Sequence, residues 1–369
     1  MTWIPLLLAD PSPCLRWLVL TQLLDRGEDD PEAGELAALR ERDPLAASLT
    51  AGQGEDGAWR MGSLPASWGD DPIRLTGHAL ARLGFLGFGP DLPAVRRGAE
   101  YLFAQQRQDG AWPLWTGQLD GAALGAGQGA GAGQGAGAGQ GAGARPAPTE
   151  DEEEGYSMIP LQTAFPLHGL AACGYATDAR AERAYEWLLA QRLPDGAWPT
   201  GIAGGNYGRV GGYRRLAHSR WGCRSNTTAA LLCLSLHPGR RQGAEARRGL
   251  DLLLGRETRE AHVFGFEVSR LLGAEPVRGK LTFFARYDLA LALGLCGRAG
   301  LSTEDARVAD LVGFVKRLQG PYGLWEYPSQ PQTARWVTYD VLRSLRQLES
   351  GADWLGLEPR TPFRPYPWR

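Results

Sequence analysis

The stretch Gln106-Arg107-Gln108-Asp109-Gly110-Ala111-Trp112 decides the fold, because it recurs at residues 53–59, at 191–198 with one extra residue, and more loosely at 319–325. Asp-Gly predicts a tight turn, since Gly accepts positive φ and Asp bonds its own backbone. The Gln ends a helical pattern, where its amide can reach exposed carbonyl groups. The Trp covers the junction with a large apolar ring. We call this stretch a staple and predict that it is structural.

Composition narrows the class of protein before any site is considered. The 369 residues are 43% hydrophobic and carry a formal net charge of −2, which gives no electrostatic case for binding nucleic acid. Five Cys without a CxxC motif are typical of buried thiols in a reducing compartment. No apolar run is long enough for a signal peptide or a membrane-spanning helix. We therefore expect a cytoplasmic protein, with peripheral membrane contact left open.

Helical segments of two kinds alternate along the chain. The first kind is apolar on nearly every side and must be enclosed: 75–86, 157–173, 226–236 and 288–296. The second kind is apolar on one face and suits an outer wall: 93–106, 180–191, 245–254 and 304–318. Residues 338–348 form the last predicted helix. Two concentric helical layers satisfy both patterns, so we predict an all-α fold, an α/α toroid of about five to six helical hairpins.

One region interrupts this alternation of the two helix types. Residues 117–155 are rich in Gly, Ala and Gln and end in an acidic run, which predicts a flexible insertion with too little apolar surface to fold. Without it, the staple Trp residues lie 53, 47 and 127 residues apart, and the last interval is close to two units if residues 255–266 hold a degenerate copy. We expect one toroid domain over residues 1–369, with a Pro- and aromatic-rich tail at 351–369.

The staples and the two helix types resemble the squalene cyclase and prenyltransferase superfamily, whose mark is a Gln-x-x-x-Gly-x-Trp repeat. The resemblance covers the chain from about Pro13 to Leu348. It implies a terpenoid cyclase-like α/α barrel with an apolar central cavity that holds isoprenoid chains. The chain departs from the family's Asp-x-Asp-Asp-Thr-Ala motif, since the nearest match is Arg224-Ser225-Asn226-Thr227-Thr228-Ala229. The prenyltransferase zinc pattern, Asp-x-Cys, also fails at Trp221-Gly222-Cys223.

Two Tyr-Asp pairs are the candidate catalytic residues. Tyr287-Asp288 and Tyr339-Asp340 each stand at the expected start of an inner helix. An Asp there serves as an N-cap, or as a general acid if an apolar cavity raises its pKa. We name Asp288 first and Asp340 second as candidate acids. The candidate ligand-binding residues are Tyr287, Tyr339, Trp221, Trp336, His78, His168, Asn226 and Thr227.

Metal and cofactor chemistry find little support in the sequence. A lone His within an apolar helix, such as His78 or His168, is usually a hydrogen-bonded core residue. His218 and Cys223 could supply two metal ligands, with His168, His262 or Asp288 completing the set. No tight spacing indicates that four ligands converge, so we predict neither a metal nor a cofactor.

Three functions stay open on the sequence alone. The first is an enzyme-like isoprenoid-binding toroid, either a terpene cyclase relative or a prenyltransferase-like enzyme with non-standard catalytic residues. The second is a non-catalytic scaffold that keeps the fold. The third is a subunit that binds a protein partner, which predicts an exposed apolar patch. The sequence names no substrate and no oligomeric state.

Overall fold

The structure, a computed structural model, describes residues 3–27, 29–64, 71–112, 114–115, 156–157, 160–200, 214–255, 262–275, 284, 286–351 and 361–366. The predicted insertion at 117–155 and much of the predicted tail lie outside them. Tail residues 361–366 do pack on the body, where the Thr361 backbone N–H donates to Asp251 and the Tyr366 ring stacks on Phe314.

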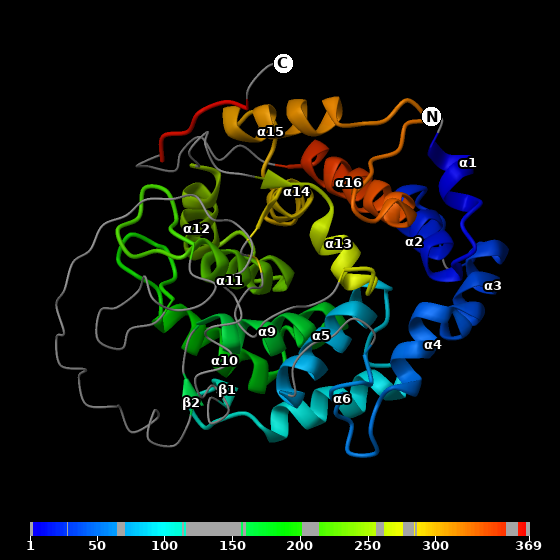
Figure 1. The fold of residues 1–369 in the computed structure, drawn as a ribbon, viewed down its shortest axis with the longest axis horizontal. Coiled ribbons are helices and arrows are strands. Elements are labelled where there is room, and N and C mark those ends of the chain that lie inside the picture. Colours follow the sequence, from blue (N-terminus) through cyan, green and yellow to red (C-terminus); the bar gives the residue numbers. More distant parts are fainter. Residues whose placement is uncertain are drawn as a thin grey trace, which may run out of the picture.

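The fold is an α/α toroid of two helical layers (Figure 1). The inner ring consists of five long helices that contact one another in sequence order: α5 (Pro72–Phe85), α9 (Pro160–Leu170), α11 (Arg224–Leu236), α14 (Leu289–Arg298) and α16 (Ala334–Glu349). The outer layer contains α3 (Pro31–Leu39), α4 (Pro44–Ala51), α6 (Pro93–Ala104), α10 (Ala179–Ala190), α12 (Ala244–Leu254) and α15 (Ala306–Arg317).

The remaining elements are short or lie at the edge of the ring. Helices α1 (Trp3–Leu8) and α2 (Pro13–Leu23) pack on α16, and η2 (Ala171–Tyr175) extends α9 as a π-helical turn. The 3₁₀ turns η1 and η4 span Arg40–Arg42 and Pro331–Thr333. Two-residue strands pair as β1 (Leu114–Trp115) with β2 (Tyr156–Ser157), and as β3 (His262–Val263) with β4 (Tyr287–Asp288).

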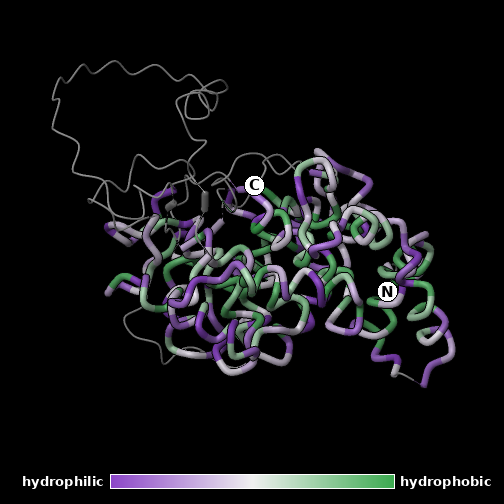
Figure 2. Tube along the Cα trace, turned by 90° about the horizontal axis from the view of Figure 1, so that it is seen from below, coloured by the Kyte–Doolittle hydropathy of each residue, from purple (hydrophilic) through white to green (hydrophobic). Residues whose placement is uncertain are grey.

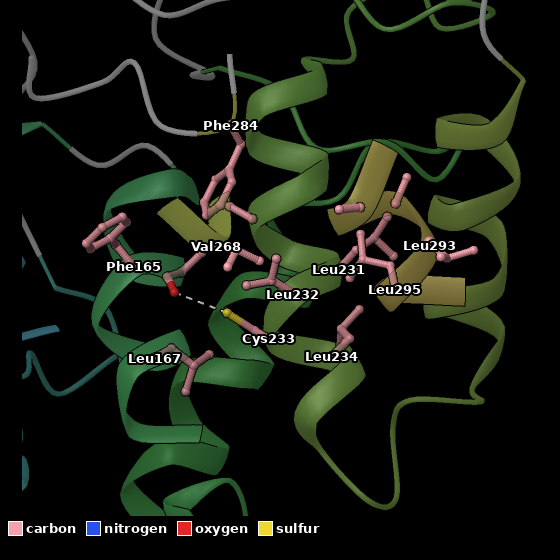
Figure 3. Close-up of a cluster of buried hydrophobic side chains, with 14 of the residues drawn as sticks. Phe165, Leu167, Leu231, Leu232, Cys233, Leu234, Val268, Phe284, Leu293 and Leu295 are labelled. Carbon is pink, nitrogen blue, oxygen red and sulfur yellow. Dashed lines mark hydrogen bonds between the residues drawn. The ribbon is translucent and has the colours of Figure 1, made fainter. Parts of the chain in front are cut away.

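Burial follows the two predicted helix types. Residues 224–235 of α11 are all buried, whereas α10 buries only Ala181, Ala184, Tyr185 and Leu188. Figure 2 shows hydrophilic and hydrophobic stretches alternating along the helical coils. All five Cys are buried and free, as predicted. In Figure 3 the Cys233 thiol of α11 points at α9, where it donates to the Ala164 carbonyl oxygen at 3.1 Å.

The four staples are built alike. The Gly of each has positive φ: Gly57, Gly110, Gly196 and Gly323. The indole Nε1 donates to a carbonyl ten residues earlier: Leu49, Leu102, Leu188 and Val315. The backbone N–H of the same Trp donates to a Thr hydroxyl in the next inner helix: Thr76, Thr163, Thr227 and Thr338. Each staple therefore fastens the end of an outer helix to an inner one.

The expected degenerate staple near 255–266 takes a different form. The chain turns inward at Gly265 and forms a short helix, α13 (Phe266–Leu271), which contacts both α5 and α16. This helix appears at the centre of the toroid in Figure 1. It has no Trp, and its first backbone N–H groups donate to the carboxylate of Asp288, the N-cap of the next inner helix, instead of to a Thr hydroxyl. The inner layer therefore contains an element that the sequence pattern did not predict.

Candidate functional site

A cavity of about 110 Å³ lies among the inner helices. The C-terminal halves of α5, α9 and α11 line it together with α14 and α16, and α13 contributes one wall. Its apolar lining includes Ala81, Phe85, Phe165, Leu232, Phe284 and Leu291. Figure 3 shows Phe284 and Val268 gathering beside Leu232 of α11. The cavity is not wholly apolar, in contrast to what the resemblance implies.

Helix α13 carries the first two charged groups into the cavity. Its position is fixed at both ends. The Asp288 carboxylate accepts the backbone N–H groups of Gly265 (3.0 Å) and Glu267 (2.8 Å). At the other end, the Arg82 guanidinium donates to the carbonyl oxygens of Leu271 (2.8 Å) and Leu272 (3.2 Å), where a helix terminus favours a cation.

Glu267 of α13 is an acid of the cavity lining whose pKa is raised. Its side chain is buried, and Oε2 pairs with Arg270 Nη2 at 3.0 Å. Oε1 is buried and has no hydrogen-bond partner among the described residues. Burial raises the pKa of Glu267 to about 7 and Asp288 adds to the rise, while Arg270 and Arg286 oppose it. A carboxyl group with this pKa exchanges its proton near neutral pH.

Two further arginines line the cavity from α14 and α16. Arg343 donates to the Asp340 carboxylate on its own helix. Arg298 ends α14, and within the described part of the chain it makes no hydrogen bond or ion pair. Burial, with Arg343 adding, lowers the pKa of Arg298 to about 10, so it remains protonated at neutral pH. Together with Arg270, these residues give the cavity lining three arginines, against the two carboxyl groups of Glu267 and Asp340.

His78 and His168 both line this cavity. Burial lowers the pKa of His78 well below its usual range, and Arg270 and Arg82 add to the effect. Burial, with Arg298 and Arg270 adding, lowers the pKa of His168 to about 3. Both rings are therefore neutral at physiological pH and add no charge to the site.

The two candidate acids lie in different places. Asp288 is the N-cap of α14, and its third backbone partner is the N–H of Ala290 at 3.0 Å. It is absent from the cavity lining, although burial raises its pKa to about 6. Asp340 does line the cavity. We expected Asp340 at the start of a helix, and this was wrong. The turn Pro331–Thr333 leads into the helix earlier, and α16 begins at Ala334.

The other candidate ligand residues lie away from the cavity lining. The Tyr339 hydroxyl donates to Gln22 Oε1 (2.7 Å), and Tyr287 is buried with its hydroxyl near the Leu253 carbonyl oxygen (3.4 Å). Trp336 packs on Phe85, and Trp221 is 41% exposed. Asn226 accepts the backbone N–H of Leu161 (2.7 Å) and so joins two inner helices. Thr227 accepts the backbone N–H of Trp198 (3.1 Å) and so anchors a staple.

Sequence analysis missed the charged residues Glu267, Arg270, Arg298 and Arg343. Arg298 offered a signal, since it ends the otherwise apolar run 289–297. Glu267 and Arg270 offered only a weaker signal: opposite charges three residues apart, directly after the degenerate staple at 255–266. No cluster of three His, Cys, Asp or Glu side chains suited to a metal ion is found among the described residues. In the same part of the chain, no helix is long and apolar enough to span a membrane.

Comparisons with known proteins give only distant likenesses. No protein-family model matches the sequence, and no curated protein matches it. A solved structure of a protein from Actinoplanes is 18% identical, with a TM-score of 0.44, over 94% of this chain and 90% of that one. The type II terpene cyclase MstE from Scytonema is 14% identical in its apo form, with a TM-score of 0.30, over 82% of this chain and 95% of that one.

A variant of MstE in complex with geranylgeranyl dihydroxybenzoate is 15% identical, with a TM-score of 0.30, over 83% of this chain and 96% of that one. Likenesses at these identities and TM-scores assign no activity to this chain. The fold and the cavity together define the class: an α/α toroid with a small, charged cavity between its inner helices.

Proposed function

We propose that the cavity binds a small, mainly apolar ligand of the isoprenoid type, with Glu267 as its acid–base group. One observation carries this proposal: a buried carboxyl oxygen without a partner among the described residues belongs to a side chain that lines a cavity with aromatic and aliphatic walls. An unsatisfied buried polar atom costs about 1–3 kcal/mol, and a ligand group that reaches Oε1 would remove that cost. Asp340 is the second candidate acid, because it lines the same cavity.

The cavity volume sets the size of the ligand. A cavity of about 150 Å³ accommodates a molecule such as benzene. The cavity here, at about 110 Å³, therefore suits a five-carbon prenyl unit and not a polyprenyl chain. A longer chain would have to displace α13, which is held by Asp288 and Arg82.

The charges argue against a cyclisation that passes through a carbocation. A cavity this small would place a cation within about 8 Å of each guanidinium, which costs about 2 kcal/mol for each at an effective dielectric constant of about 20. Asp340 and ionised Glu267 offset part of that cost, but three arginines outnumber them. Binding, with proton exchange at Glu267, agrees better with this lining than polyene cyclisation does.

A cavity-filling variant tests the proposal. Gly294 lines the cavity, and a Cβ there would meet nothing closer than Ser344 Oγ at 3.4 Å. Gly294→Leu should therefore fill the cavity without breaking the helix. The matched control is Gly313→Leu on the outer helix α15, where the nearest atom to a Cβ is Arg317 Nη1 at 3.8 Å.

We expect calorimetry to show that the wild type and Gly313→Leu bind 3-methyl-2-buten-1-ol, that Gly294→Leu does not, and that farnesol binds none of them. Equal binding by both Leu variants would place the ligand elsewhere. An acid–base role for Glu267 predicts deuterium uptake from D₂O into carbon-bound positions of the alcohol, lost in Glu267→Gln.

The second candidate function is a non-catalytic scaffold. One observation favours it: α13 fills part of the toroid's centre, and Asp288, Asn226 and Thr227 all make structural hydrogen bonds. A scaffold predicts that no prenyl alcohol of any length binds to the wild type. The same calorimetric series therefore separates the two functions.

A cytoplasmic location is part of the proposal. It is supported by the five buried thiols, which form no disulfide with one another. Burial raises the pKa of Cys173 to about 12, which keeps that thiol protonated and unreactive.

A further inference from the structure

We propose that the ligand carries a carboxylate, and that Arg298 is the residue that pairs with it. This inference rests on the proposed function, because it identifies the polar end of the molecule in the same cavity. It begins from Arg298, a cation at the end of an inner helix that lines the cavity and has no hydrogen bond or ion pair within the described ranges.

The surroundings of Arg298 explain why its guanidinium group is available to pair with a ligand. The nearby carboxylate, Asp340, is bound by Arg343 three residues further along the same helix. The other carboxyl group of the lining, Glu267, is bound by Arg270. Each acid of the lining thus has its own arginine, and Arg298 is the third arginine. Leaving a cation without a counter-charge in a small cavity is costly, and an anionic ligand would remove that cost.

The chemistry of the group favours a carboxylate. A guanidinium group presents parallel N–H donors that match the two oxygens of a carboxylate. With Glu267 ionised, the three arginines and two carboxylates of the lining leave one uncompensated positive charge, which balances a monoanion. A dianionic phosphate would bring a second negative charge toward Asp340 and Glu267.

The position of Arg343 shows how an anion would reach this site. Arg343 lines the central cavity and also a surface cleft between α2 and α16, whose other walls include Gln22, Asp25 and Arg346. The side chain of Arg343 therefore stands between solvent and Arg298. The ligand would enter from this cleft, with its carboxylate passing Arg343 before it meets Arg298.

The apolar walls would hold the rest of the ligand. Phe85, Phe165 and Leu232 lie on three different inner helices, and all three line the cavity. The complete ligand is then a short, branched or unsaturated carboxylic acid of about five carbons, with its carboxylate on Arg298 and its hydrocarbon part against these side chains.

Calorimetry with three probes of one carbon skeleton tests the inference. The probes are 3-methyl-2-butenoate, its neutral amide and 3-methyl-2-butenyl phosphate. We expect the wild type to bind the carboxylate at least tenfold more tightly than the amide and the phosphate. Arg298→Met keeps the length and apolar stem of the side chain but removes its charge. This variant should lose at least tenfold in affinity for the carboxylate and none for the amide.

Arg317→Met provides the matched control, since Arg317 ends the outer helix α15 as Arg298 ends α14, and its side chain is exposed. The control should bind all three probes as the wild type does. Equal affinity of the wild type for carboxylate and amide would overturn this inference and leave the proposed function standing. Preference for the phosphate would overturn the carboxylate assignment. Binding of no probe would overturn both proposals.

A second readout is the pH dependence of affinity. The charged and titratable groups around Glu267 are Arg270 on its own helix, Arg286 and Asp288 beside β4, and the cavity groups His78, His168, Arg298, Asp340 and Arg343. Ionisation of Glu267 above its pKa of about 7 adds a negative charge to the cavity. Affinity for the carboxylate should therefore fall from pH 6 to pH 8 in the wild type. Glu267→Gln should leave only the smaller part of that fall that Asp288, with its pKa of about 6, contributes. An undiminished fall in this variant would contradict the placement of the carboxylate in this cavity.

Discussion

The four stapled units and the unit around α13 solve the same problem in different ways. A stapled unit buries a Trp between the helical layers and satisfies its backbone N–H with a Thr hydroxyl. The unit around α13 has no Trp, and the Asp288 carboxylate accepts backbone N–H groups from a chain that has turned into the ring. The stapled units contribute stability. The departure from the repeat places Glu267 and Arg270 in the cavity.

The largest effect should come from the stapled units. Trp112 and Trp198 are both almost completely buried, so Trp112→Ala and Trp198→Ala should each lower the free energy of unfolding by about 3–5 kcal/mol. Trp221→Ala is the control, because that ring is 41% exposed and its loss should cost within about 0.5 kcal/mol. Chemical denaturation measures all three. A loss below about 1 kcal/mol at both buried sites would contradict the structural role of the staples.

Glu267 should make stability depend on pH. Its pKa is raised in the folded protein to about 7 from 4.5, so the folded state binds the proton more tightly than the unfolded chain does. This contribution is fully present below pH 4.5 and is lost as pH rises through 7, which amounts to about 3 kcal/mol.

The melting temperature of the wild type should therefore fall between pH 5 and pH 8. Asp288, whose pKa is raised to about 6, adds to the fall in the same direction. Glu267→Gln should show a clearly smaller fall. An unchanged pH profile in this variant would mean that Glu267 titrates near its ordinary pKa.

The side chains of Asp288 and Thr163 both accept backbone N–H groups, and their contributions to stability can be compared directly. Asp288→Asn replaces a carboxylate that accepts three N–H groups with an amide that has one acceptor oxygen, and should cost about 2–3 kcal/mol. Thr163→Val removes one acceptor, for the Trp112 N–H, and should cost about 1–2 kcal/mol. Denaturant midpoints of the two variants test the order. A larger loss at Thr163 would show that the carboxylate is not the stronger anchor.

The smallest effect is expected from the predicted insertion. Replacing residues 121–143 by a short Gly-Ser connection should leave the melting temperature nearly unchanged, because loop-closure entropy depends only weakly on length. Differential scanning calorimetry provides the measurement. A large drop would show that this segment packs on the toroid.

Local patterns in the sequence predicted the repeating part of the molecule well. Asp-Gly specified the turn of three staples, and the Asp carboxylates bond the backbone as expected at Ala58, Ala111 and Ala197. The N-cap role of Asp288 could also be predicted, because an N-cap depends on residues that are neighbours in the sequence. The all-round apolar helices identified the inner layer, because such helices need enclosure on every side.

The candidate site was harder to predict from the sequence, because its geometry depends on contacts between residues that are far apart in the chain. The path of α13 depends on Arg82, which binds carbonyl oxygens some 190 residues further along the chain. Nothing near Glu267 in sequence indicates that its Oε1 lacks a partner among the described residues or that its side chain lines a cavity. The position of Asp340 within α16 was missed because the helix begins at Ala334 and not near Thr338.

The way in which the ring closes has a consequence for the order of folding. Helix α16 meets the N-terminal helices through Tyr339 with Gln22, Arg335 with Asp10 (3.3 Å) and Arg346 with Asp25, all pairs more than 300 residues apart. Contacts so distant in sequence form late, because the entropy of closing the chain must be offset first. During synthesis the outer and inner helices can pair as they emerge, but the cavity has no α16 wall until residues 334–349 have been made. The complete cavity, and with it the binding we propose, is therefore the last feature that the chain acquires.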